Sequence, residues 1–508
     1  MANLQSSGKY GAWGGIGMSE QVNAQQQARR EAALILDNYL DRVCAKVKAK
    51  ELHPELREEL RGHLDELAAE QEERGCSPQE AAKLALEQMG DADEVGGTLG
   101  QIHKPKFNWR LLLPITIMAG LGILALFSLS AAGDGNARYV NFGLNQLFYY
   151  GIGAIVIALC VFVDYRLLRK YAVLFYAGTT ILTILLFMVR PLYVNGVPNW
   201  VGFGPFTFNW TLCMFILFLL ALPGLFERLR LEEARWNTMP HLWAIGAMLL
   251  PVALYLYFDL VAWLPLCAYA VAAFVMYARC GGSRLYLYAA PAAAAAWAGG
   301  LYLTNEHWRD RVGAILAPQQ QSPENVYLNE NMASAIREGG WLGQGFGVSG
   351  SSVVYPYNDA IFPYLTYSFG WAAAALLIGS IIWLVVLLLR SAKLVSDKNG
   401  SLLITGLSIF LAGQWIYGIA ASFGWLPFTS LVMPLIGYGG TSTVVYCAVI
   451  GLILGIYRRK DMIPTSGAYS AAKQQDEKKL LFKIGTIEVY VGSSEELEEQ
   501  RCASNPES

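Results

Sequence analysis

The stretch YLTYSFGWAAAALLIGSIIWLVVLLL, residues 364–389, contains no charged side chain. It exceeds the roughly 20 apolar residues that an α-helix needs to cross the hydrocarbon core of a bilayer. The whole chain has the same character, because 54% of its 508 residues are hydrophobic and only 15% are charged. That share exceeds what ordinary soluble domains bury in one core. The composition therefore predicts an all-α, polytopic membrane protein.

Apolar stretches of similar length recur along the chain after His103, and polar connections separate them. One connection, at about 305–362, is much longer than the others. Each stretch could span a bilayer as a helix, so we predict about ten transmembrane helices. The stretches lie near residues 111–132, 146–163, 171–189, 207–226, 242–258, 260–278, 285–304, 364–389, 402–422 and 440–457.

Lysine and arginine gather in alternate connections, for example in the segments Arg166–Lys170 and Arg390–Lys398. Connections rich in these residues stay on the cytoplasmic side of a membrane. The pattern predicts that both termini are cytoplasmic. It also predicts that the large loop between spans seven and eight is extracytoplasmic, as is the shorter loop at 190–206.

Composition divides the chain into four parts. Residues 1–27 are rich in Gly, Ser and Gln without periodicity, which predicts a disordered leader. Residues 28–103 carry apolar residues at three- and four-residue spacing, which predicts a cytoplasmic helical domain. In it, Ser77-Pro78 begins a helix and Gly90 ends one. Residues 104–460 form the ten-helix membrane domain, and residues 461–508 a cytoplasmic tail.

Charge and cysteine usage exclude several classes of partner and site. The formal net charge of −2 gives no excess that would attract nucleic acid. The eight cysteines include no Cys-x-x-Cys pair, so neither a zinc site nor a disulfide framework is predicted. The sequence also lacks a P-loop and a dinucleotide-binding motif, so no nucleotide cofactor is expected.

Several motifs lie in the predicted membrane domain. The segment GGWLGQGFG, residues 339–347, precedes Asp359-Ala360-Ile361-Phe362, and residues 426–445 read LPFTSLVMPLIGYGGTSTVV. Asp164-Tyr165-Arg166 ends the second span, and NGVPNWVGFG, residues 195–204, follows in the next outer loop. In this order and spacing, the motifs resemble the SEDS family, the FtsW, RodA and SpoVE type of bacterial cell-wall proteins.

The resemblance implies a peptidoglycan glycosyltransferase. Such an enzyme polymerises lipid II into glycan strands at the outer leaflet during cell division, elongation or sporulation, and releases undecaprenyl diphosphate. The resemblance also implies that Asp359 is catalytic. A sugar hydroxyl is a poor nucleophile at neutral pH, so a carboxylate within hydrogen-bond reach must take its proton. By residue type alone, Asp359 would more simply be a solvated loop residue before the following helix, or the N-cap of that helix.

Substrate binding requires further residues, because a departing diphosphate needs positive charge or N–H donors. A divalent cation, Mg²⁺ or Mn²⁺, could bridge the diphosphate, although the sequence has no dedicated cluster of metal ligands. The arginines among the candidates could instead anchor the chain at lipid headgroups, and the tryptophan could belong to the aromatic belt. The candidates are Arg190 and Arg337 for charge, Gly343 and Gly345 for backbone amides, Trp200 for stacking on a sugar, and Asn195 in the same loop motif.

The chain departs from the family pattern where charged residues would be expected. Tyr367 and Ser368 stand in place of two glutamates, Asn199 in place of an arginine, and Leu212 within a replaced Pro-Ser-Glu motif. These losses leave a non-catalytic scaffold or regulator of wall synthesis as one alternative. A flippase or transporter of lipid-linked precursors is another, although a carrier would concentrate ionisable residues at mid-membrane.

The resemblance also implies partners besides lipid II and membrane lipids. A class B penicillin-binding protein transpeptidase is expected, because no outward segment contains a Ser-x-x-Lys motif for acyl transfer. Small residues in GWAAAALLIGS, residues 370–380, could pair with a partner's helix or pack within the chain. The domain at 28–103 resembles the small prefix domains of bacterial permeases. All these features place the chain in the bacterial cytoplasmic membrane.

Overall fold

The chain folds as two compact units, residues 107–460 in one and residues 1–106 with 461–508 in the other. The computed structural model describes residues 14–47, 53–102, 108–133, 141–189, 191–194, 197–203, 206–231, 238–258, 263–283, 285–286, 288–289, 292, 299–300, 303–304, 309–310, 312–313, 323–348, 353, 356–358, 360–426, 432–460, 480–484 and 487–490.

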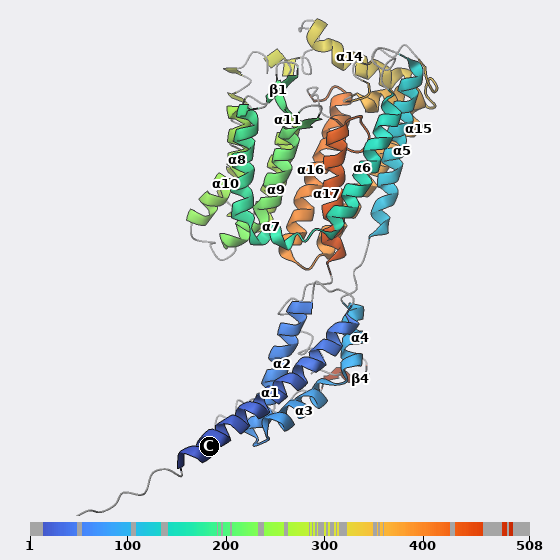
Figure 1. Ribbon diagram of the computed structural model, residues 1–508. Helices are drawn as coiled ribbons and strands as arrows, with labels where there is room; N and C mark the ends of the chain where they lie inside the picture. Colours follow the sequence, from blue (N-terminus) through green and yellow to red (C-terminus); the bar gives the residue numbers. More distant parts are fainter. Residues whose placement is uncertain are drawn as a thin grey trace, which may run out of the picture. The chain divides into compact units, whose positions relative to one another are not determined.

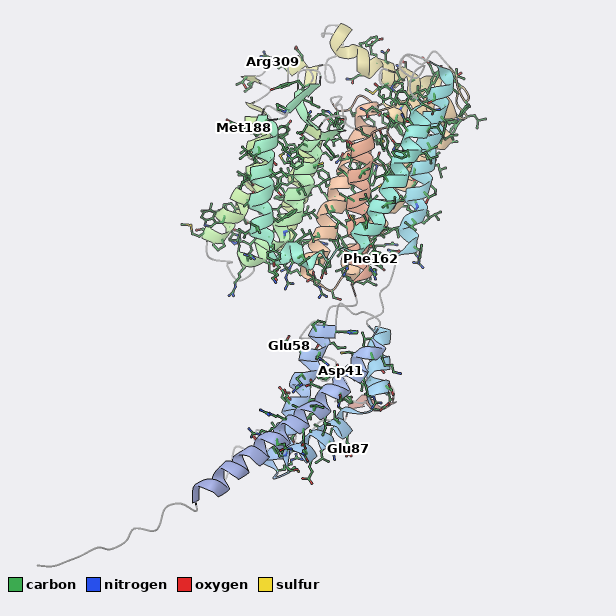
Figure 2. The ribbon with its side chains drawn as sticks, viewed as in Figure 1. Asp41, Glu58, Glu87, Phe162, Met188 and Arg309 are labelled. Carbon is green, nitrogen blue, oxygen red and sulfur yellow. The ribbon has the colours of Figure 1, made fainter. Side chains whose placement is uncertain are left out.

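The smaller unit contains a four-helix bundle with an apolar core. Leucines on α1 and α2 are fully buried in it, while Asp41, Glu58 and Glu87 lie on the outside (Figure 2). The tail adds a two-stranded antiparallel sheet of β4 (Leu480–Ile484) and β5 (Ile487–Tyr490). The helices are α1 (Gly14–Lys46), α2 (His53–Glu73), α3 (Pro78–Met89) and α4 (Ala92–Ile102).

The ends of α3 confirm the prediction for this helix. Ser77 Oγ accepts a hydrogen bond from the Glu80 amide, and the Glu80 carboxylate accepts one from the Ser77 amide. Gly90 ends the helix with φ 95°, a region that favours glycine. The predicted leader was wrong in part, because α1 already begins at Gly14. Gln, Ala, Glu and Arg have good helix propensity and extend a helix without an apolar pattern.

The larger unit contains eight helices, among the described residues, that are long and apolar enough to cross a membrane (Figure 1). A ninth helix, α11 (Trp263–Arg279), is shorter and falls in the predicted sixth span. Most of the predicted seventh span, 285–304, lies outside the described residues. The eight are α5 (Leu112–Ala132, after the 3₁₀ turn η2, Trp109–Leu111), α6 (Phe142–Phe162), α8 (Ala172–Val189), α9 (Trp210–Arg228), α10 (Thr238–Tyr257), α15 (Ile361–Leu394), α16 (Lys398–Ser422) and α17 (Gly440–Arg458).

The loop predicted at 190–206 is a small antiparallel sheet, which adds strands to an otherwise helical membrane unit. Its strands are β1 (Pro191–Val194), β2 (Val197–Phe203) and β3 (Phe206–Asn209), in the order β1-β2-β3. Asn-Gly between Val194 and Val197 is a strong hairpin turn sequence, which explains the sheet.

The two ends of the larger unit differ. The sheet and α14 (Pro323–Glu338) lie at one end, and the basic helix α7 (Arg166–Lys170) lies at the other (Figure 1). Met188 and Arg309 mark the first end and Phe162 the second (Figure 2). Helices α9, α16 and α17 are mostly buried, whereas α6, α8 and α10 expose apolar side chains. Exposed apolar helix faces are expected where a protein meets lipid.

Helices α6 and α17 pack closely because glycines on α17 leave room for the backbone of α6. A Cβ on Gly451 would lie 2.9 Å from Ile157 Cα, and one on Gly455 would lie 3.0 Å from the Cys160 carbonyl oxygen. These two glycines form a Gly-x-x-x-Gly motif, which permits close helix contact in membranes. The pairing fixes α17 against α6 along its length.

A buried arginine closes the basic end of this helix pair. Arg459 is 2% exposed, and its guanidinium donates to the carbonyls of Val161, Phe162 and Val163 at distances of 2.9 to 3.2 Å. The last carbonyls of a helix lack partners within the helix, and a cation there also favours the helix dipole. Arg459 therefore caps the end of α6.

We expect Arg459→Met to lower the thermal stability of the purified protein by several degrees. Hydrogen bonds from a charged group contribute about 1.5–3 kcal/mol, and the substitution leaves buried carbonyls without donors. Thermal unfolding in detergent measures the effect. Lys460→Met is the matched control, since Lys460 is only partly buried and lies over the Tyr457 ring. Equal midpoints for the two variants would contradict the capping role.

Candidate active site

The residues that flank Asp359 meet a second motif of the sequence, residues 426–445. Asp359 itself lies outside the described residues, whereas residues 356–358 and the start of α15 are described. The Tyr357 carbonyl accepts a hydrogen bond from the Tyr438 amide at 2.8 Å. Two motifs separated by more than sixty residues of sequence are therefore adjacent in the fold.

Close backbone approach joins the same two segments. A Cβ on Gly437 would lie 2.9 Å from the Asn358 carbonyl oxygen, so a glycine is needed there. The Asn358 side-chain oxygen is buried and has no hydrogen-bond partner in the described part of the chain. On the other side of Asp359, Ala360 is fully buried. Both neighbours of Asp359 are therefore held in the protein.

Aromatic rings on α6 pack against both segments. The Phe142 ring stacks on Tyr357 with centroids 4.6 Å apart and meets the Tyr438 ring edge-on at 4.9 Å. Burial raises the pKa of the Tyr438 phenol, so this group is neutral at pH 7. Such ring pairs stabilise by about 0.5–1.5 kcal/mol beyond their buried area. Phe142 thus holds the segment before Asp359 against the one that contains Tyr438.

Hydrogen bonds from the same end of α6 position the second segment. Gln146 is fully buried; its oxygen accepts from the Gly439 amide at 3.3 Å, and its amide nitrogen donates to Thr443 Oγ1 at 3.0 Å. One turn further, the Tyr150 hydroxyl donates to the Leu435 carbonyl at 2.6 Å. The outer end of α6 is therefore a common platform for both segments.

Residues 432–437 are themselves buried between helices. Trp415 of α16 donates its indole N–H to the Pro434 carbonyl at 3.0 Å. On α5, a Cβ on Gly122 would lie 2.6 Å from the Ile436 carbonyl oxygen, so only glycine admits this chain segment. The irregular backbone is surrounded by protein, as non-helical backbone at membrane depth requires.

A break in α15 shapes the region that follows Asp359. Residues 361–368 are all buried, and Gly370 then adopts φ 76° and ψ −179°, which is not helical. In an unbroken helix, the amides of residues 371 and 372 would bond the carbonyls of residues 367 and 368. The break frees these four groups, which cannot remain unpaired away from water without a large cost.

The segment 339–347, called the Gly-rich loop from here on, supplies partners for all four groups. It donates two amides to the freed carbonyls and offers two carbonyls to the freed amides, so the broken helix bonds are replaced by bonds to the loop. The four bonds run from Gln344 to Tyr367 (2.9 Å), from Gly345 to Ser368 (3.0 Å), from Trp371 to Gly340 (2.9 Å) and from Ala372 to Trp341 (3.2 Å).

Glycines make this contact sterically possible. A Cβ on Gly339 would collide with the Thr366 carbonyl, one on Gly343 with the Ser368 carbonyl, and one on Gly370 with the Trp341 carbonyl. The repeated glycines of the motif therefore serve close approach of two backbones. That approach fixes the loop on the buried start of α15.

The predicted role of Gly343 and Gly345 as amide donors to a diphosphate does not fit this geometry. The Gly343 amide donates to the Gly339 carbonyl at 2.9 Å, and the Gly345 amide donates to Ser368. The Gly347 amide likewise donates to Ser128 Oγ at 3.0 Å. These donors are already used within the protein, and the Gly345 amide is one of the two that bond the carbonyls freed by the helix break. Gly343 and Gly345 therefore have a structural role in the site.

The other predicted binding residues are spread over the same end of the unit. Arg337 is exposed in the last turn of α14. Trp200 is half-buried in β2, where it pairs with Leu192 and Asn209. Arg190 and Asn195 lie outside the described residues. Of the predicted binding residues that the structure describes, Gly343 and Gly345 are the ones whose described contacts reach α15, the helix that follows Asp359.

The departures from the family pattern belong to internal packing. The Tyr367 ring lies in an apolar cluster with Met332 and Ala335 of α14. Ser368 is fully buried, and its hydroxyl has no partner among the described atoms. Asn199 accepts a hydrogen bond from Thr211 at 3.3 Å. Neutral residues at these positions suit buried surroundings, where an unpaired charge would be costly.

Comparison with known proteins identifies relatives of this chain. Residues 109–462 match the family of cell cycle proteins that comprises FtsW, RodA and SpoVE. A probable peptidoglycan glycosyltransferase FtsW of Trichlorobacter lovleyi is 23% identical over 71% of this chain and 96% of its own length. The corresponding protein of Mycobacterium tuberculosis is 24% identical over 85% of this chain and 84% of its own.

Two solved structures share the fold. A chain of a peptidoglycan synthase complex superimposes with a TM-score of 0.59 at 22% identity, over 70% of this chain and 98% of that one. The rod shape determining protein RodA of Thermus thermophilus gives 0.51 at 20% identity, over 70% and 97%. The family match covers most of the chain, and the fold agrees with it. The protein therefore belongs to the FtsW, RodA and SpoVE family of cell cycle proteins, the family that its motifs resemble.

Proposed function

We propose that this multi-pass protein of the cytoplasmic membrane is a peptidoglycan glycosyltransferase that polymerises lipid II at the outer leaflet. One observation carries the proposal: the Gly-rich loop, the Asp359 segment and the segment 432–440 form one bonded assembly at the end of the unit opposite the basic helix α7. Two curated relatives, matched over 96% and 97% of their own length, are named probable peptidoglycan glycosyltransferases, which supports the same activity.

In the proposed reaction, Asp359 accepts the proton of an attacking sugar hydroxyl. The hydroxyl oxygen forms a bond to the anomeric carbon of a second lipid-linked sugar, and the bond from that carbon to the diphosphate breaks. The electron pair leaves with undecaprenyl diphosphate. A positioned general base contributes about 10²–10⁴-fold to such a rate. The α6 platform and the Gly-rich loop hold both sides of Asp359, which limits its movement.

The residues that bind the substrate are part of the same proposal. Arg190 and Arg337 would bind the diphosphate, and Trp200 and Asn195 would contact the sugars. Of the two candidate arginines, Arg337 is the one that the structure describes, and it is exposed in α14. Binding of a planar guanidinium to phosphate oxygens is strong and directional.

A divalent cation, Mg²⁺ or Mn²⁺, would fit at the diphosphate. The described residues contain no group of three or more His, Cys, Asp or Glu that could hold a metal. Mg²⁺ commonly binds through one or two protein oxygens together with substrate phosphates. The Asp359 carboxylate would be one suitable donor, and the buried Asn358 oxygen, which has no partner among the described residues, would be another. The ion would neutralise charge on the leaving diphosphate.

The proposal includes a class B penicillin-binding protein as partner, which would cross-link the strands. One solved neighbour belongs to a peptidoglycan synthase complex that coordinates polymerization and crosslinking. Within residues 370–380, Ala374 is fully buried and packs inside the chain, whereas Ala372, Ala375 and Gly379 are exposed. The exposed residues are those available to a partner's helix.

A non-catalytic scaffold of wall synthesis is the second candidate, because Tyr367 and Ser368 are buried and uncharged. Purified full-length protein in vesicles with lipid II and Mg²⁺ separates the two. We expect glycan polymer on a gel, with less after chelation of the metal. Absence of polymer, both alone and with a transpeptidase added, would contradict the enzymatic proposal. Translocation of lipid II without polymer would favour the flippase alternative.

A further inference from the structure

The Gly-rich loop presents two large apolar side chains that the protein does not cover. Trp341 is 81% exposed and Leu342 is 84% exposed, the largest fractions among the described large hydrophobic residues. An exposed pair of this kind in a loop is costly in water and marks a contact surface. The position of Trp341 and Leu342 in the fold indicates what these side chains contact.

These side chains stand on rigid backbone. The Trp341 carbonyl accepts the Ala372 amide at 3.2 Å, and the neighbouring Gly340 carbonyl accepts the Trp371 amide at 2.9 Å. The following residue, Gly343, is bonded to Gly339. The loop therefore holds Trp341 and Leu342 outward on a fixed support.

The support lies at the outer boundary of the membrane. Trp341 bonds to Ala372, where the lipid-crossing part of α15 begins, and Arg390 lies near its other end. From Ala372 to Arg390 a helix rises about 27 Å, close to the roughly 30 Å of a hydrocarbon core. Leu376 and Ile382 are exposed further along α15, between Ala372 and Arg390. The loop pair therefore lies at the level where the exposed apolar part of α15 begins.

Neighbouring side chains mark the same depth. The rings of Trp371 and Phe423 stack with centroids 6.1 Å apart, and those of Phe423 and Trp425 with centroids 5.2 Å apart. Trp425 is 71% exposed. Tryptophan concentrates at the interface between lipid and water. The exposed Glu338 in the last turn of α14 lies three residues before Trp341 and marks the start of the aqueous side.

We propose that Trp341 and Leu342 form an interfacial anchor that inserts into the outer leaflet at the level of the glycerol backbone and upper acyl chains. The anchor holds the Gly-rich loop at a fixed depth in the bilayer. The four backbone hydrogen bonds between the loop and α15 thereby also fix the position of the helix break. The partner is the lipid bilayer itself. The proposal concerns membrane contact and does not depend on catalysis.

Spin labelling of the full chain tests the anchor. Leu342→Cys is labelled in a chain whose native cysteines are replaced and which is reconstituted in phosphatidylethanolamine–phosphatidylglycerol vesicles. We expect the label to collide severalfold more with oxygen than with a water-soluble nickel chelate. Glu338→Cys is the matched control and should show the reverse. Equal, water-like behaviour at both positions would overturn the proposal.

A second measurement leaves the native cysteines unchanged and follows tryptophan fluorescence. Lipids brominated near the top of their acyl chains should quench the fluorescence of the wild type more than that of Trp341→Phe, by about the share of one tryptophan. Identical quenching would overturn the anchor. Protection of the Leu342 label only after addition of a single-span transpeptidase would also overturn it, because the surface would then bind protein.

Discussion

Replacing Asp359 by alanine is expected to lower the rate of lipid II polymerisation by about 10²-fold or more. The carboxylate is the proposed base, and no other acidic residue lies among the described neighbours 356–358 and 360–362. The thermal midpoint should not change, because Tyr357 and Tyr438 hold this segment through backbone and ring contacts. Polymer formation from purified protein in vesicles, followed over time, measures the effect.

Two variants control this experiment. Glu338→Ala removes an exposed carboxylate from the last turn of α14 and should leave the rate unchanged. Asp359→Asn keeps the size of the side chain but cannot accept a proton, so it should be as inactive as the alanine variant. Normal polymer yield from both Asp359 variants would exclude the catalytic role and support the scaffold.

Gly370→Ala is expected to lower the polymerisation rate at least about tenfold and to lower the thermal midpoint by several degrees. Gly370 has φ 76° and ψ −179°, a region essentially restricted to glycine where a side chain costs about 1–3 kcal/mol, and its new Cβ would collide with the Trp341 carbonyl. This collision is relieved only if the Gly-rich loop moves away from α15. That movement disturbs backbone hydrogen bonds that each contribute about 1 kcal/mol. Each 1 kcal/mol shifts the midpoint by about 2–4 °C in a domain of 150–250 residues.

Gly379→Ala is the matched control in the same helix. A Cβ on Gly379 would meet nothing within 4 Å, and the residue has helical backbone geometry. Alanine is the better helix former, so stability should hold or rise slightly. If Gly370→Ala had the same polymerisation rate and thermal midpoint as Gly379→Ala, the hydrogen bonds between the Gly-rich loop and α15 would not be needed for activity or stability.

Much of the fold follows from local properties of the sequence. Apolar runs without charge predict spans, and eight of the predicted ten coincide with long apolar helices. Ser77 and Gly90 end α3 as predicted, because capping depends on neighbouring residues alone. The sheet at 191–209 was missed, although Asn195-Gly196 is a hairpin signal that would have revealed it.

The roles of the glycines could not be predicted from the sequence. A Gly-rich loop suggests either amides free for a ligand or close approach of two backbones. The choice depends on whether the amides have partners, and Gly345 finds its partner in Ser368 on another element. Likewise, Gln146 shows no motif in the sequence, yet it joins Gly439 and Thr443 at the platform.

Residue type and spacing along the chain were enough to predict the membrane class, the family motifs and the candidate base, because each depends on short stretches of sequence. Tertiary structure alone decided that the Asp359 segment lies against residues 437–438, that the amides of Gly343 and Gly345 are occupied, and that Trp341 faces outward. The physical reason is that broken helices free backbone groups, and buried backbone groups must find partners. Which distant segment supplies those partners depends on how the helices pack, and no local pattern encodes that packing.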